Sequence, residues 1–365
     1  MKNILFSLLL LGIGTAVVAQ SNYKEASNSL ARYMQSGDIK QLESAKKFTD
    51  AGYKTKRDSS SSRNNILRAM IYSSLAYADS TRKIKSDKDP IIMARDAEAL
   101  IRSRDKGKFT NEIKYIHQNL IAAYIYKANN EILAKKYADA YQSYLEVEKL
   151  GTKTEDVIYN LALLASQAGK TEEAIAYYST LVKGTNADAA KYLELAELYR
   201  GKKDMQQYLS TLENARTKFP KNKQILFQLI EVYTVNKRSA AITPIIDEAI
   251  AYEPANIDLI YLAGYANENE GNIDRAKVYY QKVIELDNNN YNANLALGLI
   301  FLNDFLKNTN NLEDQYNAQS YLLKANEIKP YDMGALKGLA MYYKAAGDES
   351  QLDRVNLLLN QLSNN

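Results

Sequence analysis

Few residues of this 365-residue chain have types and spacings suited to catalysis or metal binding. The chain has one histidine, His117, and no cysteine, so neither a His/Cys metal site nor a two-histidine proton relay can form. The sequence contains no Gly-rich phosphate loop and no Gly-x-Ser-x-Gly turn, and its acidic residues are scattered over helix faces. We therefore expect no enzyme activity and no cofactor or metal, and we expect His117 to be packed or solvated.

The 29 tyrosines are the second feature with chemical potential, because their rings could stack on sugars or nucleic-acid bases. Several of them instead recur at helical spacing among other apolar residues, which is typical of packing. These are Tyr144, Tyr178, Tyr280 and Tyr343. We expect them to lie in the core, and we expect no nucleic-acid binding.

Most of these tyrosines belong to a sequence pattern that repeats every 34 residues. Four blocks begin at Glu155, Ala189, Lys223 and Ile257, and apolar residues within each block are spaced three and four apart, the period of a helix face. Each block closes on a residue that stops or disfavours a helix, namely Asn186, Pro220, Pro254 and Asn288. Each block therefore predicts a helix hairpin, and hairpins of this period bury their apolar faces by stacking.

The columns resemble the tetratricopeptide repeat, whose pattern places small and aromatic residues where two helices touch. The match is carried by Ile260, Ala263, Gly264, Ala276, Tyr280 and Val283, and by Ile158, Leu161, Ala162, Ala174, Tyr178 and Leu181. The chain departs from the pattern at Tyr208, Ile242 and Asn267. The resemblance implies an all-α fold, a right-handed α-solenoid of stacked antiparallel hairpins, that serves as a non-enzymatic scaffold for protein–protein interaction.

In the resembling family, a ligand groove is lined by the first helix of each hairpin. The matching positions here are Tyr159, Leu163, Leu193, Glu197, Arg200, Phe227, Glu231, Tyr261, Tyr265, Glu268, Leu295 and Leu299. They mix apolar groups with acids, which suits another protein's peptide or helix that carries apolar and some basic side chains. They lack the Lys and Asn set that clamps a C-terminal carboxylate in some members. The alternative is that these residues only touch the neighbouring helix.

Outside the four clear blocks the same phase continues. We expect repeats to start near residues 121, 155, 189, 223, 257, 291 and 333, so that residues 121–365 form one array. The block at 291 carries an eight-residue insertion between its helices, near Phe305 to Asp314, whose core Asn308 to Asn311 is expected to be a loop. The block at 333 is expected to be a polar terminal cap. Residues 20–120 are expected to form degenerate helical hairpins, with loops at Lys54 to Asn65 and Asp105 to Thr110.

The start of the chain has the pattern of a secretory signal. Residues 1–19 combine Lys2, an apolar run and a small-residue end at Val17 and Ala19. This predicts an exported protein, periplasmic or extracellular, with no transmembrane segment after cleavage. Because there is no cysteine, we do not expect a lipoprotein.

Charge is unevenly distributed along the chain. Residues 20–120 hold 20 Lys and Arg against 12 Asp and Glu, whereas residues 121–365 hold 26 against 31. The basic region suggests an alternative function, an envelope-assembly factor whose N-terminal part docks on anionic polysaccharide or lipid. Such basic faces are usually only solvated.

Overall fold

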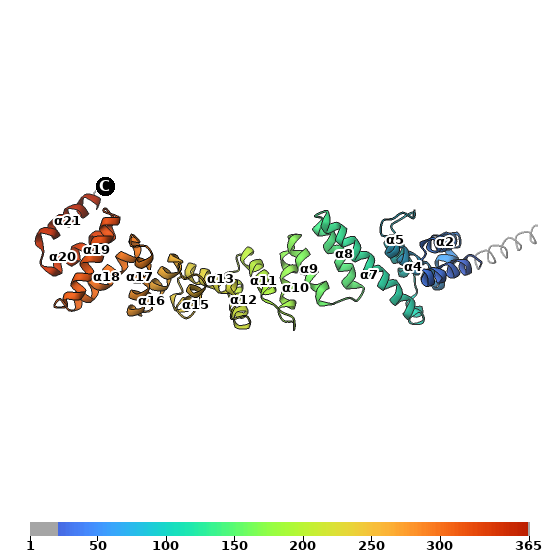
Figure 1. Cartoon of the computed structure of the whole chain (residues 1–365). Coiled ribbons are helices and arrows are strands. Elements are labelled where there is room, and N and C mark those ends of the chain that lie inside the picture. The colour runs from blue at the N-terminus through green and yellow to red at the C-terminus, as the bar shows by residue number, and fades with distance from the viewer. Residues whose placement is uncertain (1–20, 364–365) are drawn as a thin grey trace, which may run out of the picture. The chain divides into compact units, whose positions relative to one another are not determined.

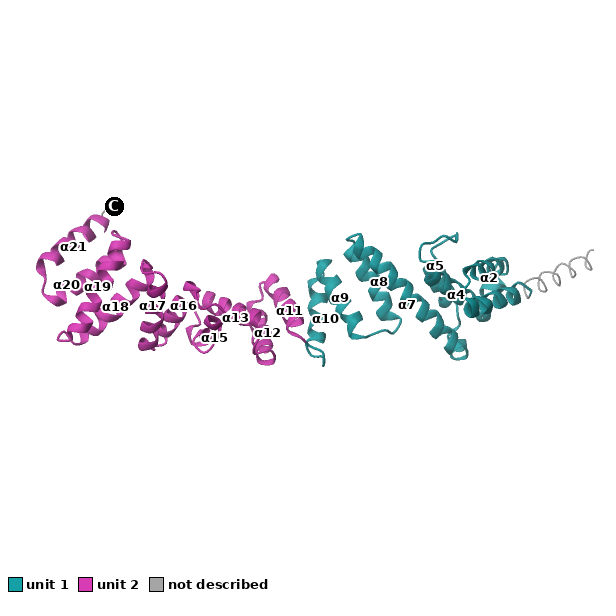
Figure 2. Ribbon diagram, viewed as in Figure 1, with its two compact units in different colours: residues 1–187 teal, residues 188–365 magenta. Residues whose placement is uncertain are grey.

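The structure is a computed structural model, and it describes residues 21–363. The predicted signal peptide, residues 1–19, lies outside the described residues. Within residues 21–363 the secondary structure is helical and contains no strand. No helix in this range has the length and apolarity needed to cross a membrane. The chain divides into two compact units, residues 1–187 and residues 188–365 (Figure 2).

Unit 1 is a succession of helices joined by short connections (Figure 1). A helix over residues 21–36 comes first. It is followed by α2 (Ile39–Ala51), α3 (Lys56–Ser59), α4 (Ser62–Ala78), α5 (Pro90–Ala99), α6 (Ser103–Lys106), the 3-10 turn η1 (Gly107–Phe109), α7 (Thr110–Leu133), α8 (Tyr137–Lys149), α9 (Glu155–Gln167) and α10 (Thr171–Leu181). Helix α4 packs against α2, α5 and α7, and α7–α8 and α9–α10 form hairpins.

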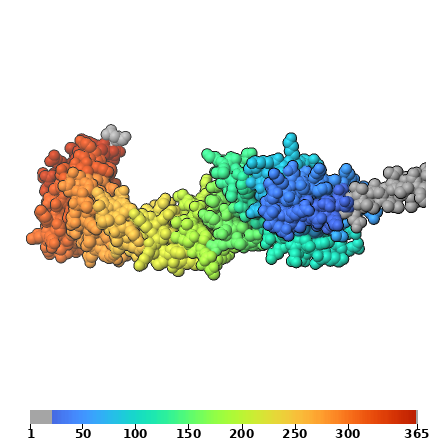
Figure 3. Space-filling model, turned by 45° about the vertical axis from the view of Figure 1, so that its right-hand side comes forward, coloured from blue at the N-terminus to red at the C-terminus, as the bar shows by residue number. Residues whose placement is uncertain are grey.

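Unit 2 consists of five further hairpins. Its elements are α11 (Ala189–Gly201), α12 (Met205–Lys218), α13 (Lys223–Val235), α14 (Ser239–Ile242), α15 (Ile246–Tyr252), α16 (Ile257–Asn269), α17 (Ile273–Leu286), α18 (Tyr291–Lys307), α19 (Leu312–Ile328), α20 (Met333–Ala346) and α21 (Glu349–Ser363). Successive helices pack on one another, as in an α-solenoid. In the space-filling view of Figure 3, the atoms of the C-terminal helices, coloured orange to red, form one continuous packed body.

A column of capping residues fixes where the first helix of each repeat begins. In each case a short polar side chain accepts the backbone N–H three residues on, which satisfies a donor that the helix itself leaves unpaired. The column, again at intervals of 34 residues, is Thr154, Asp188, Asn222, Asn256 and Asn290. These caps set the start of five hairpins, from α9 to α18, at the same phase of the repeat.

The small residues of the repeat lie where two helices cross closely, as the sequence predicts. A Cβ atom at Gly264 would stand 2.6 Å from the ring of Tyr280, which is fully buried. A Cβ atom at Gly298 would stand 2.8 Å from the side chain of Leu322. Such separations are below van der Waals contact, so only glycine allows these helices to approach as they do.

The two loops expected in the N-terminal region contain short helices instead. Lys54 to Asn65 includes α3, capped by Thr55, and the first turn of α4. Asn65 is fully buried there, although no apolar periodicity marks the segment. Asp105 to Thr110 likewise continues from α6 through η1 into α7. In the first segment, the side-chain caps of Thr55 and Ser61 and the hydrogen bonds of Asn65 hold the backbone. In the second, Asp105 accepts a hydrogen bond from Ser62.

Two further expectations for unit 2 are wrong in detail. The insertion after residue 291 lengthens α18 and α19, and only residues 308–311 connect them. These four residues are the predicted loop core. Phe305, placed at the edge of the insertion by sequence, is instead part of α18: it is 1% exposed, with its ring centroid 5.8 Å from that of Tyr342. The second helix of the repeat at Lys223 is split into α14 and α15 around Pro244, because proline cannot donate the backbone hydrogen bond that a continuous helix needs.

Candidate functional site

An open hollow of about 650 Å³ lies in unit 2 between α13 and α16. It is lined from α13, from the connection before α16 and from the first three turns of α16. The lining residues are Phe227, Thr234, Glu253, Asn256, Asp258, Leu259, Tyr261, Leu262 and Tyr265. Two consecutive first helices thus present aromatic side chains to one cavity.

The three aromatic rings differ in how tightly they are held. Tyr265 is 46% exposed, so little of its ring is needed by the core. Tyr261 is half-buried, with its ring centroid 5.4 Å from that of Tyr280, and burial raises the pKa of its hydroxyl. Phe227 is also half-buried. Tyr261 therefore joins the core to the hollow, whereas Tyr265 is available for contact.

Charge around the hollow is mainly acidic. Lys223 supplies a cation, with its Nζ 3.0 Å from Glu253 and 5.1 Å from the centroid of the Phe227 ring. Asp258 is exposed at the rim and has no ion pair within the described residues. After Glu253 is matched by Lys223, the lining keeps a negative charge beside its aromatic rings.

The structure brings together part of the predicted groove set. Phe227, Tyr261 and Tyr265 share the hollow. Glu231 is exposed on α13 but does not line it. Glu268 accepts a hydrogen bond from the Tyr280 hydroxyl at 2.7 Å, so this carboxylate is tied to a packing residue.

The remaining predicted positions lie on other helices. Leu193 on α11 is only 9% exposed, so little of its side chain is available for contact. Glu197 and Arg200, also on α11, pair with each other at 2.5 Å. Leu295 packs on a core cluster, and Leu299 on the same helix is 40% exposed.

Tyr159 and Leu163 belong to α9 in unit 1. Tyr159 is 40% exposed, and its ring meets the ring of Tyr178 edge-on at 6.5 Å. Leu163 is half-buried. Neither residue is part of the hollow in unit 2.

The repeat columns do not predict several residues of the hollow. Glu253, Asn256, Asp258, Leu259 and Leu262 line it from the end of one repeat and the start of the next. Asn256 also caps α16 through the backbone N–H of Leu259, at 3.1 Å. The recurrence of short polar residues every 34 positions was the available signal for this rim.

His117 is paired rather than solvated. Its Nε2 lies 2.6 Å from Oε1 of Glu98, which joins α7 to α5. Burial opposes ionisation of Glu98, but the hydrogen bond with His117 and the nearby positive charges, including Arg95, outweigh it, so the pKa of Glu98 is lowered. Among residues 21–363, no group of three or more His, Cys, Asp or Glu is arranged to hold a metal ion.

No curated protein matches the sequence. Of the solved structures, YrrB, described as a TPR protein with an unusual peptide-binding site, is 20% identical over 54% of this chain and 97% of its own, with a TM-score of 0.39. MamA from Desulfovibrio magneticus RS-1 is 16% identical over 50% of this chain and 98% of its own, with a TM-score of 0.34.

The family identification comes from the sequence of two hairpins. A family model described as "Tetratricopeptide repeat" matches residues 155–183 and 257–290, which form α9–α10 and α16–α17. In both hairpins the residues of the small and aromatic packing columns are buried, including Ala162, Tyr178, Gly264 and Tyr280. This chain contains tetratricopeptide repeats at residues 155–183 and 257–290.

Proposed function

We propose that this protein is a non-enzymatic interaction scaffold that binds a peptide or partner helix in the hollow between α13 and α16. The observation that carries the proposal is the convergence of Phe227, Tyr261 and Tyr265 on one cavity. Aromatic rings held on a rigid helix stack lose little conformational entropy on binding, which makes them effective anchors.

The chemistry of the lining defines the class of partner. Its aromatic and leucine side chains favour an apolar anchor on the partner. Asp258 and Glu253 favour a flanking Lys or Arg, and a partner cation could replace Lys223 over the Phe227 ring. We therefore propose a segment with one or two large apolar residues beside a basic residue.

The proposed compartment is the cell envelope or the exterior. Its support is the sequence of residues 1–19 alone. Determining the N-terminus of the protein recovered from its native cells tests this point. Cleavage close to residue 19 is expected, and an intact Met1 would contradict export.

The binding proposal is tested by selecting peptides from a random library on the full chain. We expect selected peptides to be enriched in large apolar residues next to Lys or Arg. The double substitution Phe227→Ala with Tyr265→Ala should abolish their capture, since truncating such an anchor typically costs about 2 kcal/mol or more. Tyr261 is left intact because it packs on Tyr280.

A matched control removes two tyrosines elsewhere in unit 2. Tyr316 and Tyr331 are each 70% exposed and do not line the hollow. The variant with Tyr316→Ala and Tyr331→Ala should capture the same peptides as the unsubstituted protein. Equal capture by the Phe227/Tyr265 variant would place recognition elsewhere.

A further inference from the structure

Two connections of unit 1, distant in sequence, are locked together at the start of α4. Asn65 donates hydrogen bonds to the carbonyl oxygens of Ser59, at 3.0 Å, and Leu100, at 3.2 Å. Ser62 Oγ donates to Asp105 at 2.7 Å and accepts the backbone N–H of Arg102 at 3.3 Å. The connection before α4 and the connection after α5 thus form one ordered surface.

This surface concentrates positive charge. Residues 54–62 and 100–108 together hold seven Lys and Arg against two acids. We call these seven residues the basic loop cluster, and all of them are exposed: Lys54, Lys56, Arg57, Arg102, Arg104, Lys106 and Lys108.

The two acids of these segments are occupied by their own loops. Asp58 accepts hydrogen bonds from the backbone N–H and the hydroxyl of Thr55, at 2.9 and 2.8 Å. Asp105 accepts from Ser62 and lies 3.7 Å from Nζ of Lys108. Within the described part of the chain, only Lys108 of the cluster forms an ion pair, with Asp105. Arg102 donates a hydrogen bond to the carbonyl oxygen of Ser60 at 2.9 Å. The cluster therefore presents most of its positive charge to solvent.

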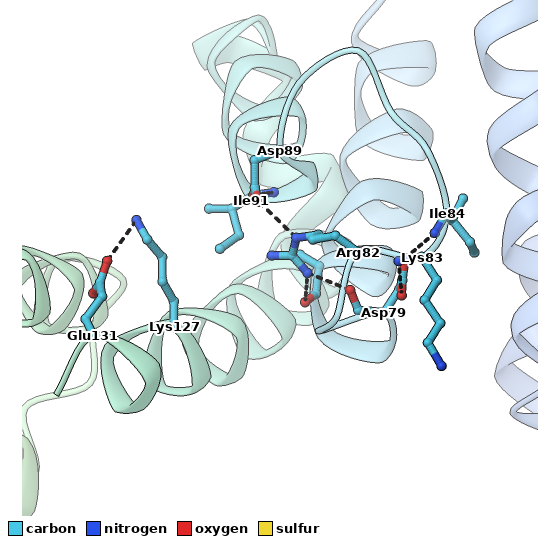
Figure 4. A network of polar contacts seen from close by, with 9 residues as sticks. Asp79, Arg82, Lys83, Ile84, Asp89, Ile91, Lys127 and Glu131 are labelled. Carbon is cyan, nitrogen blue, oxygen red and sulfur yellow. Dashed lines mark hydrogen bonds and ion pairs between the residues drawn. The ribbon is translucent and has the colours of Figure 1, made fainter. Parts of the chain in front are cut away.

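The opposite end of α4 is different, although it is also rich in lysine. Figure 4 shows the loop of residues 79–89, in which Arg82 Nε donates to Asp89 at 2.9 Å and the Asp79 carboxylate accepts from the backbone of Lys83 and Ile84. Residues 79–89 contain four basic and three acidic residues, so the loop is nearly neutral. By its length of roughly 25 Å, α4 separates this nearly neutral loop from the basic loop cluster.

An exposed leucine lies within the basic loop cluster. Leu100 is 52% exposed, and its backbone carbonyl is held by Asn65, so its position is fixed beside the cations. An anionic polysaccharide or a soluble polyanion would complement the charges and leave Leu100 in water. A bilayer with anionic phospholipids complements both, because phosphates meet the cations and the headgroup boundary accepts an apolar side chain.

We propose that the basic loop cluster is a docking surface for a bilayer containing anionic phospholipid, with Leu100 entering the headgroup boundary. This surface lies in unit 1 and is independent of the hollow between α13 and α16. It would bring the scaffold and its bound partner to a membrane surface.

The contact is located by lysine reactivity on the full chain. Vesicles of equal parts phosphatidylglycerol and phosphatidylcholine should protect Lys54, Lys56 and Lys106 from an amine-modifying reagent at low salt. They should leave Lys83 and Lys85 reactive, since these lie at the other end of α4. Vesicles of phosphatidylcholine alone should protect none of the five.

Partitioning of variants tests the energetics. Replacing Lys56, Arg57, Arg104 and Lys106 with Gln should lower the partition coefficient at least a hundredfold, since each cation near an anionic surface contributes about fivefold. The matched control replaces Lys83, Lys85, Lys153 and Lys183 with Gln, the same change of charge at exposed positions of unit 1. Every variant carries the same residues 1–20. A difference in partition coefficient between the two quadruple variants is therefore due to the cluster residues.

Leu100→Ser separates a bilayer from a soluble polyanion. It should weaken vesicle binding up to about tenfold while leaving binding of dextran sulfate unchanged. The proposal is supported if the cluster variant loses more of its vesicle partitioning than the control variant and Leu100→Ser weakens vesicle binding alone. Equal partitioning of the two quadruple variants, or protection of the cluster lysines by dextran sulfate and not by anionic vesicles, would overturn it.

Discussion

Hairpin α16–α17 packs through small and apolar residues, whereas the helices around α4 pack around buried polar side chains. In the hairpin, Ala263, Ala276, Tyr280 and Val283 are fully buried, and Gly264 allows the ring of Tyr280 to approach. Around α4, Asn65 is equally buried but makes three hydrogen bonds to groups outside its own helix. The packing of hairpin α16–α17 is thus determined by the shape of apolar side chains, whereas the packing around α4 is determined by hydrogen bonds between polar groups.

The polar packing around α4 extends to an ion pair. The guanidinium of Arg68 lies over the rings of Tyr53 and Tyr72, at 4.5 and 4.8 Å. Its NH1 is 2.6 Å from Asp50, and the Tyr72 hydroxyl donates to the same carboxylate at 2.8 Å. Because partly buried charges need partners, each member of this group depends on the others.

The largest effect is expected from removing the last hairpin of the apolar array, residues 333–365. Leu336 and Leu339 of α20 are buried, and Tyr342 covers Phe305 of α18. Loss of this hairpin exposes a continuous apolar face, so we expect aggregation in size-exclusion chromatography. A monomer with an unchanged melting curve would show that the array needs no terminal cover.

Two fully buried asparagines provide the next test. Asn65→Ala leaves the Tyr53 hydroxyl and the carbonyls of Ser59 and Leu100 without a partner, so we expect a loss of about 3 kcal/mol in the free energy of unfolding. Asn267→Ala removes chiefly a bond to the carbonyl of Ala263 in its own helix and should cost about 1 kcal/mol. Chemical denaturation measures both. Equal losses would remove the distinction between the two regions.

A smaller effect is expected for glycine in the apolar region. Gly264→Ala places a methyl group against the ring of Tyr280 and should cost about 2 kcal/mol through overpacking. Gly271→Ala meets no atom within 4 Å, but its φ of +77° is in the left-handed region, so we expect about 1 kcal/mol. Thermal unfolding of both variants checks the order, and a reversed order would contradict the close helix crossing.

The smallest effect concerns pH and the polar region. Burial disfavours ionisation of Asp50, but hydrogen bonds from Lys46 and Tyr72 and the charge of Arg68 outweigh it, so its pKa is lowered. A lowered pKa in the folded state adds stability above the unfolded value of about 4, and that stability is lost as pH falls through the folded value. Below pH 4 the melting temperature should therefore fall less for Asp50→Asn than for the unsubstituted protein. Parallel falls would exclude this role for Asp50.

The same contrast explains what the sequence could predict. Apolar periodicity is visible in a sequence, so the hairpins and the close approach at Gly264 were predictable. Partners of a polar side chain are not visible, and Asn65, which meets Leu100 across 35 residues, was therefore assigned to a loop. Likewise, Leu193 is in a groove column but is covered, because exposure depends on neighbouring helices rather than on position in the repeat.

The most direct test of the account is the affinity of one selected peptide, measured by calorimetric titration alongside the melting temperature. The variant with Phe227→Ala and Tyr265→Ala should bind at least about 30-fold more weakly, equivalent to about 2 kcal/mol, with a melting temperature close to that of the unsubstituted protein. The Tyr316/Tyr331 control should be unchanged in both measurements. Undiminished affinity in the Phe227/Tyr265 variant, with a melting temperature that falls sharply, would mean that these rings are core and that the hollow is not the binding site.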